Sequence, residues 1–201
     1  MASFSLVHGA WGGGWLWDLL RAELESRGHV VHAPDLPCED VAAGVEEYAA
    51  AVPAADVVVG YSLGGFTIPF VEAETHVFLT ALLAGTGGEG VFVDGFGDAR
   101  VRDELGRSYY PHAADAAREL QYPDAELATR LRRQAPLGSD ELVPARSLYV
   151  VCTRDAAVEP DWQRRATAAV GADIVELDAG HSPMLTHARE LADICERYAA
   201  S

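Results

Sequence analysis

The sequence predicts an α/β fold in which a mostly parallel sheet of about six strands carries helices on both faces. Short apolar runs alternate with segments whose apolar residues recur at helical spacing, and this alternation is typical of parallel sheets. The chain has 201 residues, of which 49% are hydrophobic, and this suits one domain with a sizeable core. We therefore expect a single domain over residues 1–201.

The expected strands are short runs rich in β-branched and aromatic residues. They cover residues 3–7, 29–33, 56–59, 77–83, 147–152 and 173–177. Between them, apolar residues recur at helical spacing, and the expected helices cover residues 16–24, 41–52, 66–71, 159–170 and 188–198. Gly28 and Gly171 follow two of these patterns, as helix-ending glycines do.

Residues 85–146 interrupt this alternation. They are richer in glycine and charge, and they contain three short helical patterns at residues 98–107, 112–121 and 124–134. We therefore expect a short helical lid, inserted within the single domain between the fourth and fifth strands. Residues 85–90 fit G-x-G-x-x-G, but β-branched residues and further glycines follow, and these form helices poorly. A lid hinge is favoured there over a dinucleotide site.

The charge of the chain limits its partners. The formal net charge is −16 at pH 7, and an acidic surface repels nucleic acids and anionic membranes. No apolar run is long enough to span a bilayer, and the first residues lack the basic region and cleavage site of a signal peptide. We expect a small-molecule substrate, no nucleic-acid partner and no membrane partner, and a homodimer is compatible with these features.

The cysteines and histidines show no metal-ligand spacing. Cys38, Cys152 and Cys195 are an odd number, and two of them fall on apolar strand or helix positions, which favours core packing. His29 and His32 lie three apart on an expected strand, so they face opposite sides of the sheet. The sequence therefore predicts no metal and no cofactor, and a reducing cytoplasm is the default compartment.

The stretch Gly60-Tyr61-Ser62-Leu63-Gly64 fits the motif G-x-S-x-G. It follows an expected strand and precedes an expected helix, which is the context of a nucleophile elbow. The sharp turn would force Ser62 into strained backbone angles and hold its hydroxyl above the sheet edge. On the motif alone, a glycine-rich turn whose serine caps a helix explains the sequence equally well.

Two further polar residues follow later strands. Asp155 comes after the fifth expected strand and His181 after the sixth. Reactive groups of parallel sheets collect at the carboxyl ends of the strands, and the order Ser62, Asp155, His181 is that of a Ser-Asp-His triad. We expect His181 to accept the proton of Ser62, and Asp155 to orient His181. Asp35 and Asp178 also follow strands and are rival acids.

The glycine-rich loop after the first strand can aim backbone N–H groups at a developing oxyanion. We expect the N–H groups of Ala10 and Leu63 to form this oxyanion hole. A simple turn between strand and helix is the alternative for this loop. We expect Trp11 and Tyr61 to lie near the substrate pocket.

Four stretches carry a family resemblance: LVHGAW at 6–11, GYSLGG at 60–65, YVVCTRD at 149–155 and GHSPML at 180–185. With them the chain resembles the plant hydroxynitrile lyase and methylesterase group of α/β-hydrolases and its bacterial esterase-like relatives. The resemblance implies the α/β-hydrolase fold, the triad and oxyanion hole given above, and Asp155 as the acid. The lyases of this group carry a lysine directly after the catalytic histidine, where this chain has Ser182, so the resemblance implies an esterase.

The expected function is therefore that of a serine hydrolase that cleaves a small, mostly uncharged ester through an acyl-enzyme. A lactonase, thioesterase, C–C hydrolase or biosynthetic cyclase on the same triad is the first alternative, because fold and triad do not decide the substrate. A hydrolase-fold protein that binds a ligand without turnover is the second.

Overall fold

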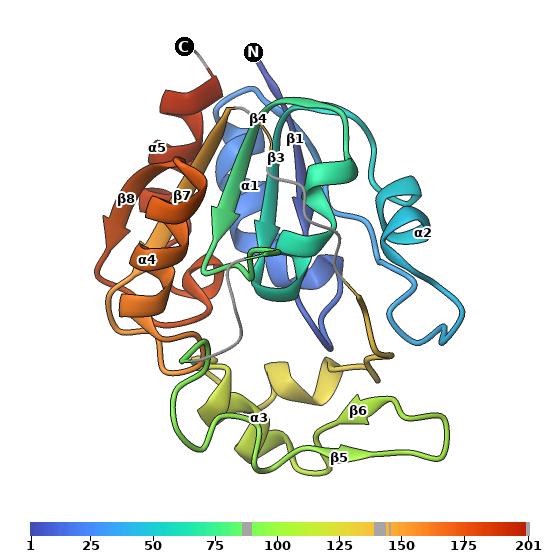
Figure 1. Cartoon of the computed structure of the whole chain (residues 1–201). Helices are drawn as coiled ribbons and strands as arrows, with labels where there is room; N and C mark the ends of the chain where they lie inside the picture. The colour runs from blue at the N-terminus through green and yellow to red at the C-terminus, as the bar shows by residue number, and fades with distance from the viewer. Residues whose placement is uncertain (86–89, 139–143, 145, 200–201) are drawn as a thin grey trace.

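The centre of the molecule is a six-stranded parallel sheet with the strand order β2-β1-β3-β4-β7-β8 (Figure 1). The computed structural model describes residues 1–85, 90–138, 144 and 146–199. The strands are β1 (Ser3–Val7), β2 (Val30–His32), β3 (Ala55–Tyr61), β4 (Ala73–Leu79), β7 (Ser147–Cys152) and β8 (Asp173–Leu177). The predicted fold class is confirmed.

Helices cover both faces of this sheet, since alternate residues of each strand point to opposite sides. Val57 and Val59 of β3 pack in one apolar cluster with residues of α1 (Asp18–Ser26) and α5 (Ala188–Ala199). Val58 packs in the other cluster with residues of α2 (Val45–Ala50) and α4 (Pro160–Val170). The first cluster also includes residues of the 3-10 helix η1 (Gly14–Trp17), and η5 (Pro183–Leu185) precedes α5.

The segment after β3 differs from its prediction. The helix expected over residues 66–71 is absent, and two 3-10 helices, η2 (Ser62–Phe66) and η3 (Ile68–Phe70), replace it. Pro69 lacks the N–H that a longer α-helix would need, and β4 begins only four residues later. The fourth strand lies four residues earlier than predicted because it pairs with β3 from Ala55↔Ala73 to Tyr61↔Leu79.

The lid is less helical than predicted. Residues 98–107 form no helix: they contribute β5 (Val101–Arg102) of a small antiparallel hairpin with β6 (Ser108–Tyr109). The Asp103 carboxylate stabilises the turn of this hairpin, because it accepts hydrogen bonds from the N–H groups of Leu105 and Arg107, each at 3.0 Å. The prediction over 112–121 is confirmed by α3 (Ala113–Glu119), whereas 124–134 holds only the 3-10 helix η4 (Leu127–Arg130).

The lid lies beyond the carboxyl ends of the sheet strands, beneath the sheet in Figure 1. Of the predicted hinge at 85–90, residues 86–89 lie outside the described residues. Across the described part of the chain, no helix is long and apolar enough to cross a bilayer. Cys38, Cys152 and Cys195 are buried free thiols, and for Cys152 and Cys195 this agrees with the predicted core packing.

Candidate active site

Ser62 stands at the turn between β3 and η2. Its φ of 51° lies in the left-handed region, which for a non-glycine residue costs about 1–3 kcal/mol. The neighbouring backbone lies so close to Ser62 that two positions, 9 and 64, have room only for glycine. A Cβ on Gly64 would lie 2.8 Å from the carbonyl oxygen of Val7, and one on Gly9 would lie 2.9 Å from the Ser62 Cβ. The close packing holds Ser62 in the strained conformation expected of a nucleophile elbow.

The structure brings the three predicted triad residues together. His181 Nε2 lies 3.2 Å from Ser62 Oγ, and His181 Nδ1 lies 2.9 Å from Asp155 Oδ2. An ionised carboxylate only accepts hydrogen bonds, so the proton belongs on Nδ1 and leaves Nε2 free to accept from Ser62. His181 and Asp155 are 1% and 5% exposed, so both are shielded from water. This geometry suits general-base activation of the serine hydroxyl.

The Asp155 carboxylate is fixed by further donors. Oδ1 accepts the backbone N–H groups of Ala157 at 2.8 Å and Val158 at 3.0 Å. Oδ2 accepts Gln163 Nε2 at 2.9 Å in addition to the histidine, and Gln163 is fully buried on α4. These donors leave the carboxylate one orientation.

The rival acids bond elsewhere. Asp35 accepts the N–H of Gly14 at 2.8 Å, and Asp178 forms an ion pair of 2.8 Å with Arg154 at the surface. Neither carboxylate contacts His181 in the described structure, so only Asp155 occupies the triad position.

The backbone of Ala10 and Leu63 stands beside the serine. Both residues line the same cavity as Ser62. Among the described residues, neither N–H donates a hydrogen bond to another protein group. Two unpaired backbone donors beside a nucleophile are the arrangement that an oxyanion hole requires.

The cavity beside Ser62 has a volume of about 150 Å³. Trp11 lines it as predicted, and its φ of 62° shows that the loop after β1 is strained. The lid holds this loop in place. Trp11 Nε1 donates to the carbonyl oxygen of Ser108 at 3.1 Å, and Arg132 N–H donates to the carbonyl oxygen of Trp11 at 2.8 Å. The lid therefore positions the loop that carries the Ala10 donor.

Tyr61 does not line this cavity itself, but its ring centre lies 5.0 Å from that of His181. Its side chain is 2% exposed, and burial raises its pKa well above the usual value. The hydroxyl lies 2.8 Å from Ser182 Oγ, which itself donates to the carbonyl oxygen of Leu120 at 2.7 Å. As the last residue of β3, Tyr61 points to the sheet face opposite its neighbours in sequence, and it supports the histidine loop from behind.

Sequence reasoning missed Gln121, which follows α3 in the lid. Its Oε1 accepts the backbone N–H groups of Ala156 at 2.8 Å and His181 at 2.7 Å. Its Nε2 donates to the carbonyl oxygen of Arg154 at 2.9 Å. One side chain thus joins the loop of Asp155 to the loop of His181. No local motif marks this residue, because its partners lie 33 to 60 residues away along the chain.

Replacing Gln121 with methionine should lower kcat by about 10-fold to 100-fold and leave KM nearly unchanged, because small displacements of catalytic groups are costly. Steady-state kinetics of the purified variant on a neutral ester would measure this effect. Gln121→Glu keeps an acceptor for both N–H groups and should retain more activity than Gln121→Met. Equal kcat values for wild type and Gln121→Met would show that the two loops hold their positions without Gln121.

His8 anchors the other side of the loop after β1. Its Nε2 accepts the N–H of Leu36 at 3.0 Å, and Nδ1 lies 2.8 Å from the carbonyl oxygen of Gly9. Burial lowers the pKa of His8 to about 4, so the imidazole is neutral at pH 7. The unfolded chain would bind a proton at His8 near pH 6.5, well before the folded chain does.

The free energy of unfolding should therefore fall as pH drops from about 6.5 to 4, by on the order of 3 kcal/mol through His8 alone. Urea denaturation at pH 7 and at pH 4.5 would measure the difference. The variant His8→Gln keeps an acceptor for Leu36 but cannot titrate, so its stability should depend less on pH. An unchanged pH dependence in this variant would contradict the assignment.

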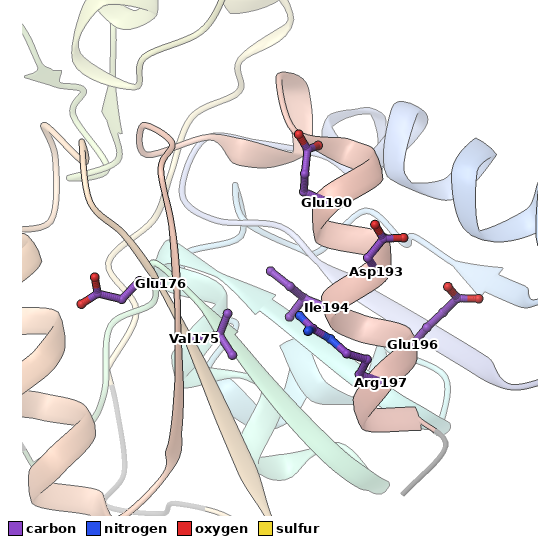
Figure 2. Close-up of a pocket in the computed structure, with 7 residues that line it drawn as sticks. All are labelled: Val175, Glu176, Glu190, Asp193, Ile194, Glu196 and Arg197. Carbon is purple, nitrogen blue, oxygen red and sulfur yellow. The ribbon is translucent and has the colours of Figure 1, made fainter.

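A larger hollow of about 640 Å³ lies between β8 and α5 (Figure 2). Its charged lining is mostly acidic, and it contains none of the predicted site residues. Within the described residues, no group of three or more His, Cys, Asp or Glu side chains could hold a metal ion. The cavity beside Ser62 is therefore the candidate active site.

A strand-end serine beside a histidine and a carboxylate, on a parallel sheet with a lid, is the arrangement of an α/β-hydrolase. The alpha/beta hydrolase family matches residues 6–194, and the chain belongs to this family. Methylesterase 3 of Arabidopsis thaliana is 25% identical in an alignment of 256 positions, which covers 96% of this chain and 96% of the relative. Polyneuridine aldehyde esterase of Rauvolfia serpentina is 25% identical in an alignment of 243 positions, which covers 94% of this chain and 92% of the relative.

Among solved structures, a pyrethroid hydrolase from Sphingobium faniae JZ-2 matches with a TM-score of 0.77 and 22% identity. The match covers 99% of this chain and 97% of that one, and at this identity it concerns the fold. Together, the comparisons confirm the resemblance to methylesterase-like α/β-hydrolases. They agree with the predicted enzyme class, an α/β-hydrolase of the carboxylic ester hydrolase type.

Proposed function

We propose that this enzyme cleaves small carboxylic esters through an acyl-enzyme on Ser62. The observation that carries the proposal is the hydrogen-bonded row from Asp155 through His181 to Ser62, at 2.9 Å and 3.2 Å. The unpaired N–H groups of Ala10 and Leu63 beside Ser62 support it. The names of the matched relatives, methylesterase and polyneuridine aldehyde esterase, agree with an ester as substrate.

In the proposed first step, Ser62 Oγ attacks the ester carbonyl while His181 Nε2 accepts the hydroxyl proton. The two backbone N–H groups bind the oxygen that becomes negative, and Asp155 stabilises the imidazolium. His181 then gives its proton to the leaving alcohol, and the acyl-enzyme remains. In the second step His181 accepts a proton from water, which attacks the acyl carbon and releases the acid and free Ser62.

The cavity size supports a small acyl or alcohol group, since 150 Å³ holds about five groups of the size of water. The reaction requires neither a metal nor a cofactor. We retain a small molecule as the expected partner and the cytoplasm as the expected compartment, where the three unpaired thiols would stay reduced.

The test is a panel of one short methyl ester, one aryl ester, one thioester and one lactone, with labelling by a fluorophosphonate probe. Preferred turnover of the esters, with labelling at Ser62, would support the proposal. Preferred turnover of the thioester or lactone would replace the ester by that substrate. Absence of both turnover and labelling would overturn the acyl-enzyme mechanism and favour a protein that binds a ligand without turnover.

A further inference from the structure

The cavity beside Ser62 is locally positive although the chain carries a net charge of −16. Two arginines, Arg100 and Arg102, line it from the lid, and none of the described lining residues is acidic. The other lining groups are mainly apolar, including Phe96 and Leu63. Arg100 is half-buried, so water screens its guanidinium less than that of the exposed Arg102, and its charge acts more strongly on a ligand there.

Arg100 is held in place by its neighbours. Its guanidinium carbon lies 5.2 Å from the ring centre of Trp11 and 5.2 Å from that of Phe96. Its Nε donates to the carbonyl oxygen of Gly97 at 3.1 Å. Contact with two rings restricts the side chain, so less conformational entropy is lost when it binds an anion.

In the described part of the chain, the terminal nitrogens of Arg100 have no acidic partner. Within the described residues, no carboxylate lies at ion-pair distance from Arg100 or from Arg102. Arg102 donates to the backbone carbonyl of Gly106 at 2.8 Å. By contrast, nearby Arg107 and Arg133 both pair with Asp103. Of these four arginines, the two without an acidic partner among the described residues, Arg100 and Arg102, are the two that line the cavity.

We propose that Arg100, together with Arg102, binds a carboxylate of the substrate, so that the preferred substrate is a half-ester of a short dicarboxylic acid. This inference rests on the proposed ester hydrolysis and replaces the expectation of a mostly uncharged substrate. Planar guanidinium groups pair with carboxylates through two parallel hydrogen bonds. Water cleaves the remaining ester bond, and the products are the dicarboxylate, the alcohol and a proton.

The experiment compares kcat/KM for monomethyl glutarate and dimethyl glutarate, which share the same acyl chain, at low ionic strength. Wild type should prefer the half-ester by about 10-fold, as one charge-assisted pair allows. Arg100→Met should lose this preference, because its kcat/KM should fall further for monomethyl glutarate than for dimethyl glutarate. Arg21→Met removes the same charge from an exposed site on α1 and should leave the preference unchanged. Binding of free glutarate to wild type and Arg100→Met is measured in parallel by calorimetry.

Each outcome decides a separate question. If wild type hydrolyses dimethyl glutarate as well as or better than the half-ester, the half-ester inference is overturned while ester hydrolysis stands. Equal losses of kcat/KM on both substrates in Arg100→Met would show that Arg100 only supports Trp11. This result would also overturn the half-ester inference. If neither ester is hydrolysed, and the ester panel and the fluorophosphonate probe show no reaction either, the proposed function fails. Glutarate binding that is lost in Arg100→Met would then still support the anion site, whereas equal binding would exclude it.

Discussion

Replacing Ser62 with alanine should lower kcat by about 10⁶-fold, because loss of the nucleophile removes the acyl-enzyme route altogether. Single-turnover kinetics on an aryl ester would measure the residual rate. Labelling by a fluorophosphonate should disappear as well, since the probe reacts with the same oxygen. The remaining activity over water would come from binding and from the Ala10 and Leu63 donors.

The exposed Ser26 provides a matched control. Among the described residues, its hydroxyl bonds only to the carbonyl oxygen of Glu23 at the end of α1, at 2.7 Å. Ser26→Ala should therefore keep both turnover and labelling at the wild-type level. Labelling or fast turnover in Ser62→Ala would place the nucleophile elsewhere and would contradict the proposed mechanism.

Replacing Asp155 with asparagine should lower kcat by about 10⁴-fold with little change in KM. The oxygen of the asparagine side chain would still accept hydrogen bonds from the N–H groups of Ala157 and Val158. The NH₂ group of the asparagine would therefore face His181. His181 Nδ1 would then have to accept, and the ring proton would move to Nε2. In that tautomer His181 cannot accept the proton of Ser62.

Asp178→Asn is the control for this variant, because Asp178 also follows a strand and carries the same charge. Its carboxylate pairs with Arg154 at the surface, and exposed pairs contribute little to stability. The control should keep wild-type kinetics across the pH range. A large loss of kcat in Asp178→Asn, with Asp155→Asn active, would reverse the assignment of the acid.

The sheet was predictable because it depends on local patterns. The same holds for the order in which the polar residues Ser62, Asp155 and His181 follow its strands. Apolar runs alternate with helical spacing, and parallel strands bring their carboxyl ends to one edge. The elbow was predictable for the same reason, since a serine between two glycines after a strand can turn in few ways. The choice of Asp155 as the acid required more than the pattern, since Asp35 and Asp178 also follow strands. The family resemblance distinguished Asp155 from these two residues.

The lid was predicted least well. Residues 98–107 have the apolar spacing of a helix, yet the Asp103 carboxylate and its hydrogen bonds to Leu105 and Arg107 favour a hairpin. Tyr61 was predicted to lie near the pocket, and its ring contacts His181 without lining the cavity itself. Both details depend on side-chain partners that spacing alone does not reveal.

The sequence alone therefore determined the fold class and the family, and it predicted the three residues Ser62, Asp155 and His181, which the fold brings together. Each of these depends on residue type and order along the chain. Only the tertiary structure decided what holds and surrounds them: Gln121 between the two triad loops, and Arg100 in the cavity wall. These roles depend on contacts between segments that are distant in the chain, and such contacts form only when the lid packs against the edge of the sheet.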